Sequence, residues 1–142
     1  GCIYVTDTLH HMVQKFDQTG NFLLKFGREG KKDGEFQQPD GIAIDKKENI
    51  FVVDVLNNRI QVFNPEGDFL FKFGGSGGGA GQFRMPHSIA ITEQGEIYVT
   101  DHGNNRVQKF SMRPSPGSYC SACGTGLQPD MVFCPNCGKR LM

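Results

Sequence analysis

A repeat of 47 residues constrains this chain more than any other feature of its sequence. The segments "IYVTD" from Ile3, "IFVVD" from Ile50 and "IYVTD" from Ile97 start 47 residues apart each time. No insertion disturbs the register between them. A fixed period of this length indicates a repeat architecture, in which each unit covers the apolar faces of its neighbours. The same step separates three phenylalanines, which are Phe16, Phe63 and Phe110.

Each period contains four short segments rich in β-branched and aromatic residues, separated by Gly, Asn, Asp and Pro. In the middle period they are "GIAID" from Gly41, "IFVVD" from Ile50, "RIQVF" from Arg59 and "FLFKF" from Phe69. Alternation in the last segment places its three aromatic rings on one face of a strand. Four strands in a period of about 40 to 50 residues are typical of a β-propeller blade. We therefore predict an all-β fold: a partial β-propeller of about two and a half four-stranded blades.

The segments "IFVVDVLNNRIQVF" and "IYVTDHGNNRVQKF", each reached through "P-x-x-I-A-I", resemble NHL repeats. The resemblance covers residues 3–110. It implies a propeller that is six-bladed in the family and that binds a partner on one face. The first blade departs from the motif at "LHHMVQKF", where His11 and Met12 replace the Asn and Arg of the other two blades.

Ten predicted strands do not close a ring, because a propeller needs at least four blades to hide its sheet edges. The predicted order is three strands, one full blade and three strands. We expect the ring to be completed by upstream blades that are missing from this chain or by oligomerisation.

One side of the propeller gathers most of the polar candidates. Strands alternate in direction within a blade. One face of the propeller therefore collects the start of the first strand, the end of the second strand, the loop after the second strand and the blade-to-blade loops 27–38 and 74–85. Asp40 and His87 open the innermost strands and are the best candidates for ligand contact. The predicted ligand-binding residues on this face are Asp40, His87, Asp54, Asp101, His102 and Asn104.

For Asp54 and Asp101, and for Asp7 in the first blade, a structural role is favoured over ligand contact. A carboxylate at the end of the second strand accepts turn N–H groups or pairs with the nearby arginine, Arg59 or Arg106. Two asparagines, Asn58 and Asn105, are expected in left-handed turn geometry. The glycine-rich stretch "GGSGGGAG" lacks a phosphate-binding pattern and is predicted to be a flexible surface loop.

His87 also raises an enzymatic alternative. The segment "GQFRMPHSIAI…IYVTDHGNNRVQKF" is similar to part of the peptidyl-hydroxyglycine amidating lyases, in which the histidine of such a "PHS" binds zinc. In this chain, His102 and Leu56 occupy the places of the catalytic arginine and tyrosine that the resemblance implies. A binding scaffold without enzymatic activity is therefore favoured over a zinc-dependent lyase.

The sequence changes character after Phe110. Residues 111–118 are rich in Pro, Ser and Gly and are predicted to be a linker, which separates the blades (1–110) from a second unit (119–142). That unit carries two C-x-x-C pairs separated by ten residues, a pattern that fits tetrahedral thiolate ligation of zinc. We predict a small structural zinc ribbon, with two disulfides as the alternative. Its predicted ligands are Cys120, Cys123, Cys134 and Cys137.

Charge and hydropathy limit the classes of partner that the chain can bind. Residues 1–110 hold 12 basic and 14 acidic side chains, so the blades lack the positive excess on which non-specific RNA binding depends. A protein partner is therefore favoured, and RNA is the alternative. No apolar run reaches the roughly 20 residues that cross a bilayer, which argues against a membrane partner. Thiolates kept for zinc favour a cytoplasmic location.

Overall fold

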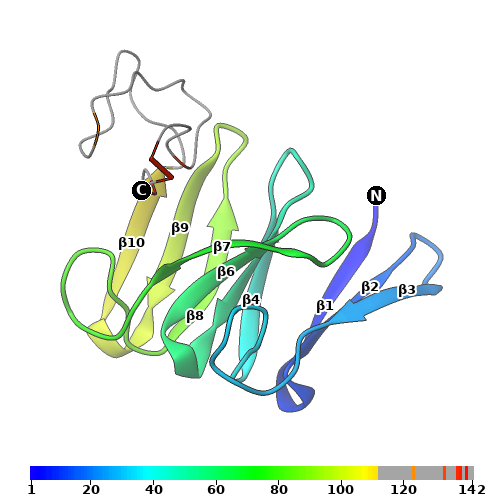
Figure 1. Ribbon diagram of the computed structural model, residues 1–142, viewed down its shortest axis with the longest axis horizontal. Coiled ribbons are helices and arrows are strands. Elements are labelled where there is room, and N and C mark those ends of the chain that lie inside the picture. Colours follow the sequence, from blue (N-terminus) through cyan, green and yellow to red (C-terminus); the bar gives the residue numbers. More distant parts are fainter. Residues whose placement is uncertain (112–122, 124–132, 134–136, 139, 141–142) are drawn as a thin grey trace.

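The computed structural model describes residues 1–111 together with 123, 133, 137, 138 and 140, and these residues form an all-β structure (Figure 1). Three antiparallel sheets stand side by side, in the strand orders β1-β2-β3, β4-β5-β6-β7 and β10-β9-β8. We refer to them as blades 1, 2 and 3. The strands are β1 Ile3–Asp7, β2 Met12–Phe16, β3 Phe22–Phe26, β4 Pro39–Ile44, β5 Ile50–Asp54, β6 Arg59–Phe63, β7 Phe69–Gly74, β8 Pro86–Ile91, β9 Glu96–Asp101 and β10 Arg106–Ser111.

The predicted partial propeller is confirmed, including its three-four-three strand order. One detail differs in the innermost strands, which begin at Pro39 and Pro86 rather than two residues later. The register shifts between Pro39 and Ile42, and again between Pro86 and Ile89, so the first residues of both strands are bulged away from the regular ladder.

Blade 2 lies between the other two sheets (Figure 1). Every residue of β5 and β6 is buried, which explains why β5 is almost uniformly apolar instead of alternating. Strand β7 alternates from Leu70 onward, with Phe71 and Phe73 buried and Leu70 and Lys72 exposed. The prediction that Phe69 shares their face is wrong, because a register shift between Val62 and Phe63 turns Phe69 toward the cluster between blades 1 and 2, while Phe71 and Phe73 pack in the cluster between blades 2 and 3.

Two apolar clusters hold the blades together. The cluster between blades 1 and 2 contains five buried residues, which are Val13, Phe36, Ile50, Val52 and Phe63. The cluster between blades 2 and 3 is larger, and its buried residues are Phe51, Val53, Val55, Ile60, Val62, Phe71, Phe73, Phe83, Ile97 and Val99. Stacked faces of neighbouring blades thus supply the core.

Short 3-10 turns follow the strand that ends in the repeated Asp of each blade, which is β1, β5 or β9: η1 Thr8–His10, η2 Val55–Asn57 and η3 His102–Asn104. Each ends in a residue with left-handed backbone geometry. Asn58 and Asn105 both have φ of 53°, which confirms the prediction for these asparagines. His11 takes the same geometry with φ of 55°, so the departure of blade 1 from the motif leaves the turn intact.

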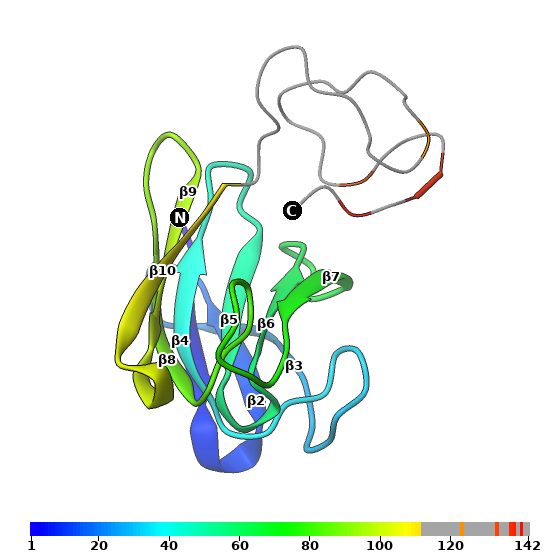
Figure 2. The same ribbon diagram turned by 90° about the vertical axis from the view of Figure 1, so that its left-hand side faces the viewer.

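Among the described residues, no helix is long and apolar enough to cross a membrane. Strand β10 runs away from the side on which η3 lies, so the chain leaves blade 3 at the opposite end of the propeller (Figures 1 and 2).

Candidate binding face

The end of the propeller that carries the three 3-10 turns also carries the blade-to-blade loops 27–38 and 74–85, as the strand directions predict. We call this end the loop face. It lies at the bottom of Figure 1. Its loops are held by two copies of one polar network, and its exposed residues form a separate small cluster.

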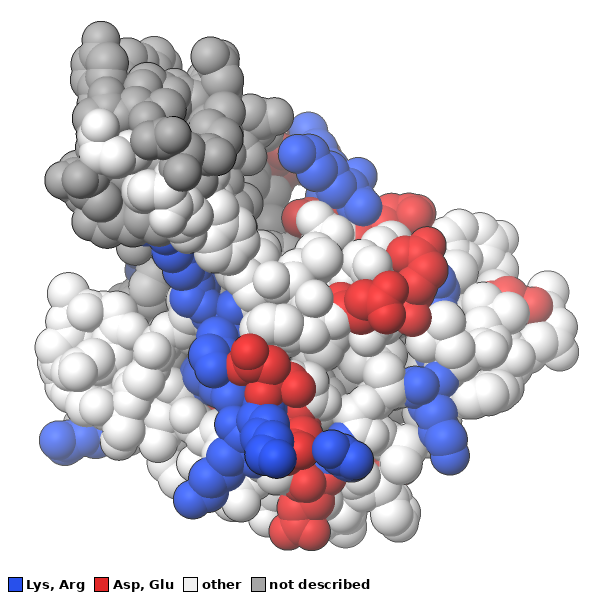
Figure 3. Space-filling view, in the orientation of Figure 1, with Lys and Arg blue, Asp and Glu red and all other residues white. Residues whose placement is uncertain are grey.

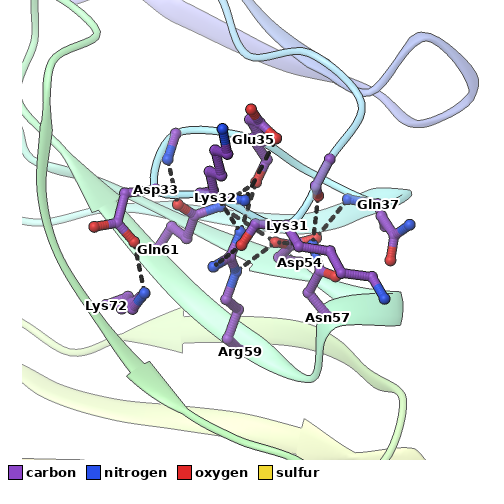
Figure 4. A network of polar contacts seen from close by, with 12 residues as sticks. Lys31, Lys32, Asp33, Glu35, Gln37, Asp54, Asn57, Arg59, Gln61 and Lys72 are labelled. Carbon is purple, nitrogen blue, oxygen red and sulfur yellow. Dashed lines mark hydrogen bonds and ion pairs between the residues drawn. The ribbon is translucent and has the colours of Figure 1, made fainter.

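The network of blade 2, drawn in Figure 4, is centred on Asp54. This carboxylate has no exposed surface and forms an ion pair of 2.7 Å with the buried Arg59. One oxygen accepts the backbone N–H of Gln37 at 2.7 Å, and the other accepts the side chains of Asn57 at 2.9 Å and Gln61 at 3.2 Å. The carboxylate is therefore saturated with donors beneath the loop.

Arg59 carries the network onward to the loop between blades 1 and 2. Its guanidinium donates to the carbonyl oxygens of Lys31, Lys32 and Glu35 at 2.8–3.0 Å. The amide of Gln61 also donates to Glu35 and its oxygen accepts the N–H of Gly34. We call the four side chains Asp54, Asn57, Arg59 and Gln61 the loop clamp of blade 2.

Blade 3 repeats this arrangement 47 residues later. Asp101 is fully buried, pairs with Arg106 at 2.8 Å and accepts the N–H of Arg84. Burial alone would raise the pKa of Asp101, but the donors from Arg84, Asn104 and Arg106 outweigh it and hold that pKa below its usual value. The loop clamp of blade 3 consists of Asp101, Asn104, Arg106 and Gln108.

The clamp of blade 3 binds the backbone of the glycine-rich loop. Arg106 donates to the carbonyl oxygens of Gly78, Gly79 and Gln82, and Asn104 donates to that of Gly77. These carbonyls are therefore fixed from below. Glycine is needed where the loop passes close to the sheet at Gly74, whose φ is 109° and whose added Cβ would meet the ring of Phe83 at 2.7 Å.

These contacts decide between the two expectations for the aspartates. Asp54 and Asp101 reach the loop face from beneath and expose no carboxylate to a ligand, so the structural role is the one observed. Asn104 likewise uses its amide to hold the loop. In blade 1, Asp7 lacks an arginine because Met12 stands in its place, and it contacts His10 at 2.9 Å instead.

Asp40, His87 and His102 remain as exposed candidates, and the structure brings all three together. The Nδ1 atom of His87 lies 3.0 Å from a carboxylate oxygen of Asp40, across the boundary between blades 2 and 3. The ring of His102 meets that of His87 edge-on, with centroids 5.2 Å apart. The side chains of His87 and Asp40 are 40% and 53% exposed, so a ligand can reach them.

The chemistry of this cluster follows from its donors and acceptors. An ionised carboxylate only accepts hydrogen bonds, so the Nδ1 of His87 carries the proton in the contact with Asp40. In neutral His87 the Nε2 atom is then an acceptor. The cluster, which we call the Asp-His-His cluster, presents a carboxylate and two imidazole rings, and the carboxylate suits a partner that donates hydrogen bonds.

Exposed apolar side chains accompany these polar groups on the loop face, and the sequence alone did not single them out. Leu9 in η1 is 79% exposed, while Leu56 in η2 and Met85 before β8 are each 42% exposed. Leu56 and Met85 belong to loops joined by a hydrogen bond of 2.8 Å, from the N–H of Met85 to the side chain of Asn58. The signal that could have found them is their position in turns, where apolar residues have no strand to pack against.

Few residues of the cysteine tail are described. Phe133 and Arg140 form an antiparallel bridge, Cys137 lies in a turn, and Gly138 has a left-handed φ of 71°. Among the residues that the structure describes, no group of three metal-ligating side chains is gathered. Two of the four predicted ligands, Cys120 and Cys134, lie outside the described residues.

Three family models match the chain. An NHL-repeat model matches residues 83–110, a model described as a 6-bladed beta-propeller matches residues 1–55, and a zinc-ribbon domain model matches residues 116–141. The blades thus carry an NHL repeat, and the cysteine tail matches a zinc-ribbon domain. The NHL-repeat and zinc-ribbon resemblances seen in the sequence are thereby confirmed.

A curated relative and several solved structures are similar to parts of this NHL propeller. Protein brain tumor of Drosophila melanogaster is 40% identical over 42 residues, which are 30% of this chain and 4% of the relative. A streptogramin B lyase structure aligns with a TM-score of 0.58 at 14% identity, covering 82% of this chain and 39% of the lyase.

Two further solved structures show the same likeness. Virginiamycin B lyase from Staphylococcus aureus, in complex with quinupristin, aligns with a TM-score of 0.55 at 16% identity over 80% of this chain and 39% of its own. A protein of unknown function from Bacteroides thetaiotaomicron aligns with a TM-score of 0.62 at 16% identity over 78% and 32%. At these identities the likeness shows the fold alone. The chain spans well under half the length of each of these relatives.

Proposed function

We propose that the NHL propeller is a binding scaffold without enzymatic activity and that its loop face recruits a protein partner. The observation that carries the proposal is the exposed Asp-His-His cluster, held across the boundary of two blades and set among exposed Leu56 and Met85 on the same face. A mixture of acceptor atoms and apolar side chains suits a peptide that offers a basic or amide donor beside an apolar residue.

Charge favours protein over RNA as the partner. The cluster contributes a carboxylate and two histidines, and RNA binding depends on Lys and Arg that contact phosphates. Acidic and basic side chains are intermixed on the surface that Figure 3 shows, instead of forming one basic area. We further propose a structural role for zinc in the ribbon, held by the four thiolates, and a cytoplasmic location where those thiols stay reduced.

Photo-crosslinking tests the protein-binding proposal. A photoreactive residue placed at Leu56 should yield a defined cross-linked protein, and one placed at Lys46, in the turn at the opposite end of blade 2, should not. Replacing Asp40 and His87 together by Ala should lower the yield from position 56 at least about tenfold, because acceptors at the centre of an interface carry much of its affinity. Equal yields from both positions, or no effect of the double replacement, would contradict the proposal.

Two assays decide against the alternatives. Labelled RNA titrated with the full chain over a salt series should show only weak binding, and tight binding that weakens steeply with salt would favour the RNA alternative. Zinc measured in a variant with all four ribbon cysteines replaced by Ser should be absent. One zinc per chain that disappears on further replacement of His87 by Ala would favour the lyase alternative, in which Asp40 orients a metal-binding histidine.

A further inference from the structure

The last strand of blade 2 carries two aromatic rings that lie apart from the loop face. Phe71 and Phe73 are buried on β7, which forms one edge of the blade 2 sheet. The ring of Phe71 packs edge-on against Phe51, with centroids 6.4 Å apart. The ring of Phe73 packs against Phe110 at 5.1 Å. We call the pair Phe71 and Phe73 the aromatic seat, and packing within the cluster between blades 2 and 3 holds both rings in place.

Two described residues of the ribbon contact the aromatic seat. The guanidinium carbon of Arg140 lies 5.3 Å from the ring centroid of Phe71 and 5.3 Å from that of Phe73. The ring of Phe133 meets the ring of Phe71 edge-on, with centroids 5.7 Å apart and an interplanar angle of 84°. These are the distances of cation–π and edge-to-face contacts. The seat therefore receives one cation and one ring from the ribbon.

A pairing within the ribbon presents these two side chains together. Phe133 and Arg140 form an antiparallel β-bridge. Side chains that lie opposite each other in such a pair project from the same face. The two residues therefore act as one binding element, in which a ring and a cation stand side by side toward β7.

Aromatic faces, and not hydrogen bonds, hold the cation of Arg140. Its Nε and Nη2 atoms are buried and have no hydrogen-bond partner among the residues that the structure describes. Burial lowers the pKa of Arg140 to about 10, which leaves the group charged at neutral pH. A planar guanidinium stacks on aromatic rings, whereas the ammonium of lysine is compact and strongly hydrated. Because buried N–H groups without acceptors oppose the attraction of the rings, the contact suits reversible binding.

The repeat shows that the seat differs between blades. The residues 47 positions before Phe71 and Phe73 are Leu24 and Phe26. Blade 1 therefore offers one ring where blade 2 offers two. A guanidinium that lies over both rings at once is matched to β7.

We propose that the aromatic seat is the docking site of the ribbon, with Arg140 and Phe133 as the docking residues. The ribbon is then held reversibly against the edge of blade 2 in solution, instead of moving freely on the linker. The chemistry that the seat recognises is an arginine beside an aromatic side chain. The seat lies on β7 and shares no residue with the Asp-His-His cluster, so the proposal does not depend on the partner of the loop face.

Hydrogen exchange of the full chain, purified with zinc and followed by mass spectrometry, tests the docking. Phe71→Leu gives the seat the residue that blade 1 carries at this position. It should lower the protection factor of the peptide that covers residues 133–140 about threefold or more, because one cation–π contact and the edge-on contact are lost. Phe69→Leu is the matched control, because it makes the same change on the same strand but at a ring that packs in the cluster between blades 1 and 2. It should leave the protection of this peptide unchanged.

Arg140→Ala tests the same contact from the ribbon. It should lower the protection of residues 133–140 as much as Phe71→Leu does, and the two substitutions combined should add little, because both remove one shared contact. Arg140→Lys should keep only part of the protection. The zinc content of each variant separates a released ribbon from an unfolded one, and Phe71→Leu decides if Arg140→Ala loses zinc, since it leaves the ribbon's own sequence intact. Unchanged protection in Phe71→Leu, equal effects of Phe69→Leu and Phe71→Leu, or fully additive effects in the double variant would overturn the proposal.

Discussion

Asp54→Ala offers the sharpest test of how the blades are held together. The substitution removes a carboxylate that accepts four hydrogen bonds, and it leaves Arg59 buried without its ion pair. Breaking a buried ion pair by removing one partner costs about 3–5 kcal/mol. Blade 1 provides an internal control at the equivalent position. Asp7 is 30% exposed and contacts the exposed His10, so Asp7→Ala should cost only about 0–1 kcal/mol.

Urea unfolding followed by far-ultraviolet circular dichroism measures both values. For a slope of about 2 kcal/mol per molar urea, the loss at Asp54 moves the midpoint down by about 1.5–2.5 M. Because such a loss is a large part of a typical domain's stability, Arg59→Lys provides a milder second variant. It keeps the charge but loses the fork that reaches three loop carbonyls, and it should cost about 1–3 kcal/mol.

The comparison refutes the reasoning if Asp54→Ala and Asp7→Ala shift the midpoint equally. That result would mean that the burial of the Asp54 carboxylate does not set its contribution to the free energy of unfolding. A loss at Asp54 together with an unchanged Arg59→Lys variant would show that the loop carbonyls contribute nothing.

Three further predictions concern packing, metal and pH. Gly41→Ala should lower the free energy of unfolding by about 1–3 kcal/mol, because the added Cβ would meet the backbone carbonyl of His87. Ser88→Ala, at the equivalent position of blade 3, should change the free energy of unfolding by no more than about 0.5 kcal/mol in the same urea assay. Elemental analysis should find one zinc per chain. The zinc should be lost when the cysteines of the first C-x-x-C pair are replaced by Ser, while the circular dichroism of the propeller stays unchanged. An unreduced mass that shows two disulfides would contradict this prediction. Hydrogen bonds from the backbone N–H of Asn21 and the side chain of Thr19 lower the pKa of Asp17 to about 2. The contribution of Asp17 to stability is therefore complete above about pH 4 and is lost as the pH falls toward 2. If NMR shows that the Asp17 carboxyl group titrates near pH 4, this prediction is refuted.

The repeat allowed the strands, the left-handed turns and the composition of the loop face to be predicted from the sequence. These features could be predicted because residues at equivalent positions of the repeat occupy the same position in successive blades. Phe71 and Phe73 illustrate this, since their alternation with Leu70 and Lys72 indicated the buried face of β7, whereas the bulge that turns Phe69 to the other side had no signal in the sequence.

The sequence could not show which of several polar residues would be buried. Asp54 and Asp40 are both acidic residues at strand ends, but one lies under a loop and the other in the open, and only the loop's path distinguishes them. The contact of Asp40 with His87 crosses a blade boundary, so no local pattern predicts it. The recurrence of Asp, Asn, Arg and Gln in blades 2 and 3, each beside a glycine-rich loop, was the available signal for the clamps.

The loop clamps also determine how the folded structure unfolds locally. Gly34 and Gln37 donate their backbone N–H groups to buried side chains of blade 2, and Gly81 and Arg84 donate theirs to the half-buried Gln108 and the buried Asp101 of blade 3. Their amide protons should therefore exchange with solvent as slowly as those of the central strands, although they lie in surface loops. A blade cannot fray without releasing the segment that arrives from its predecessor, so local opening is passed along the row of sheets as a concerted event.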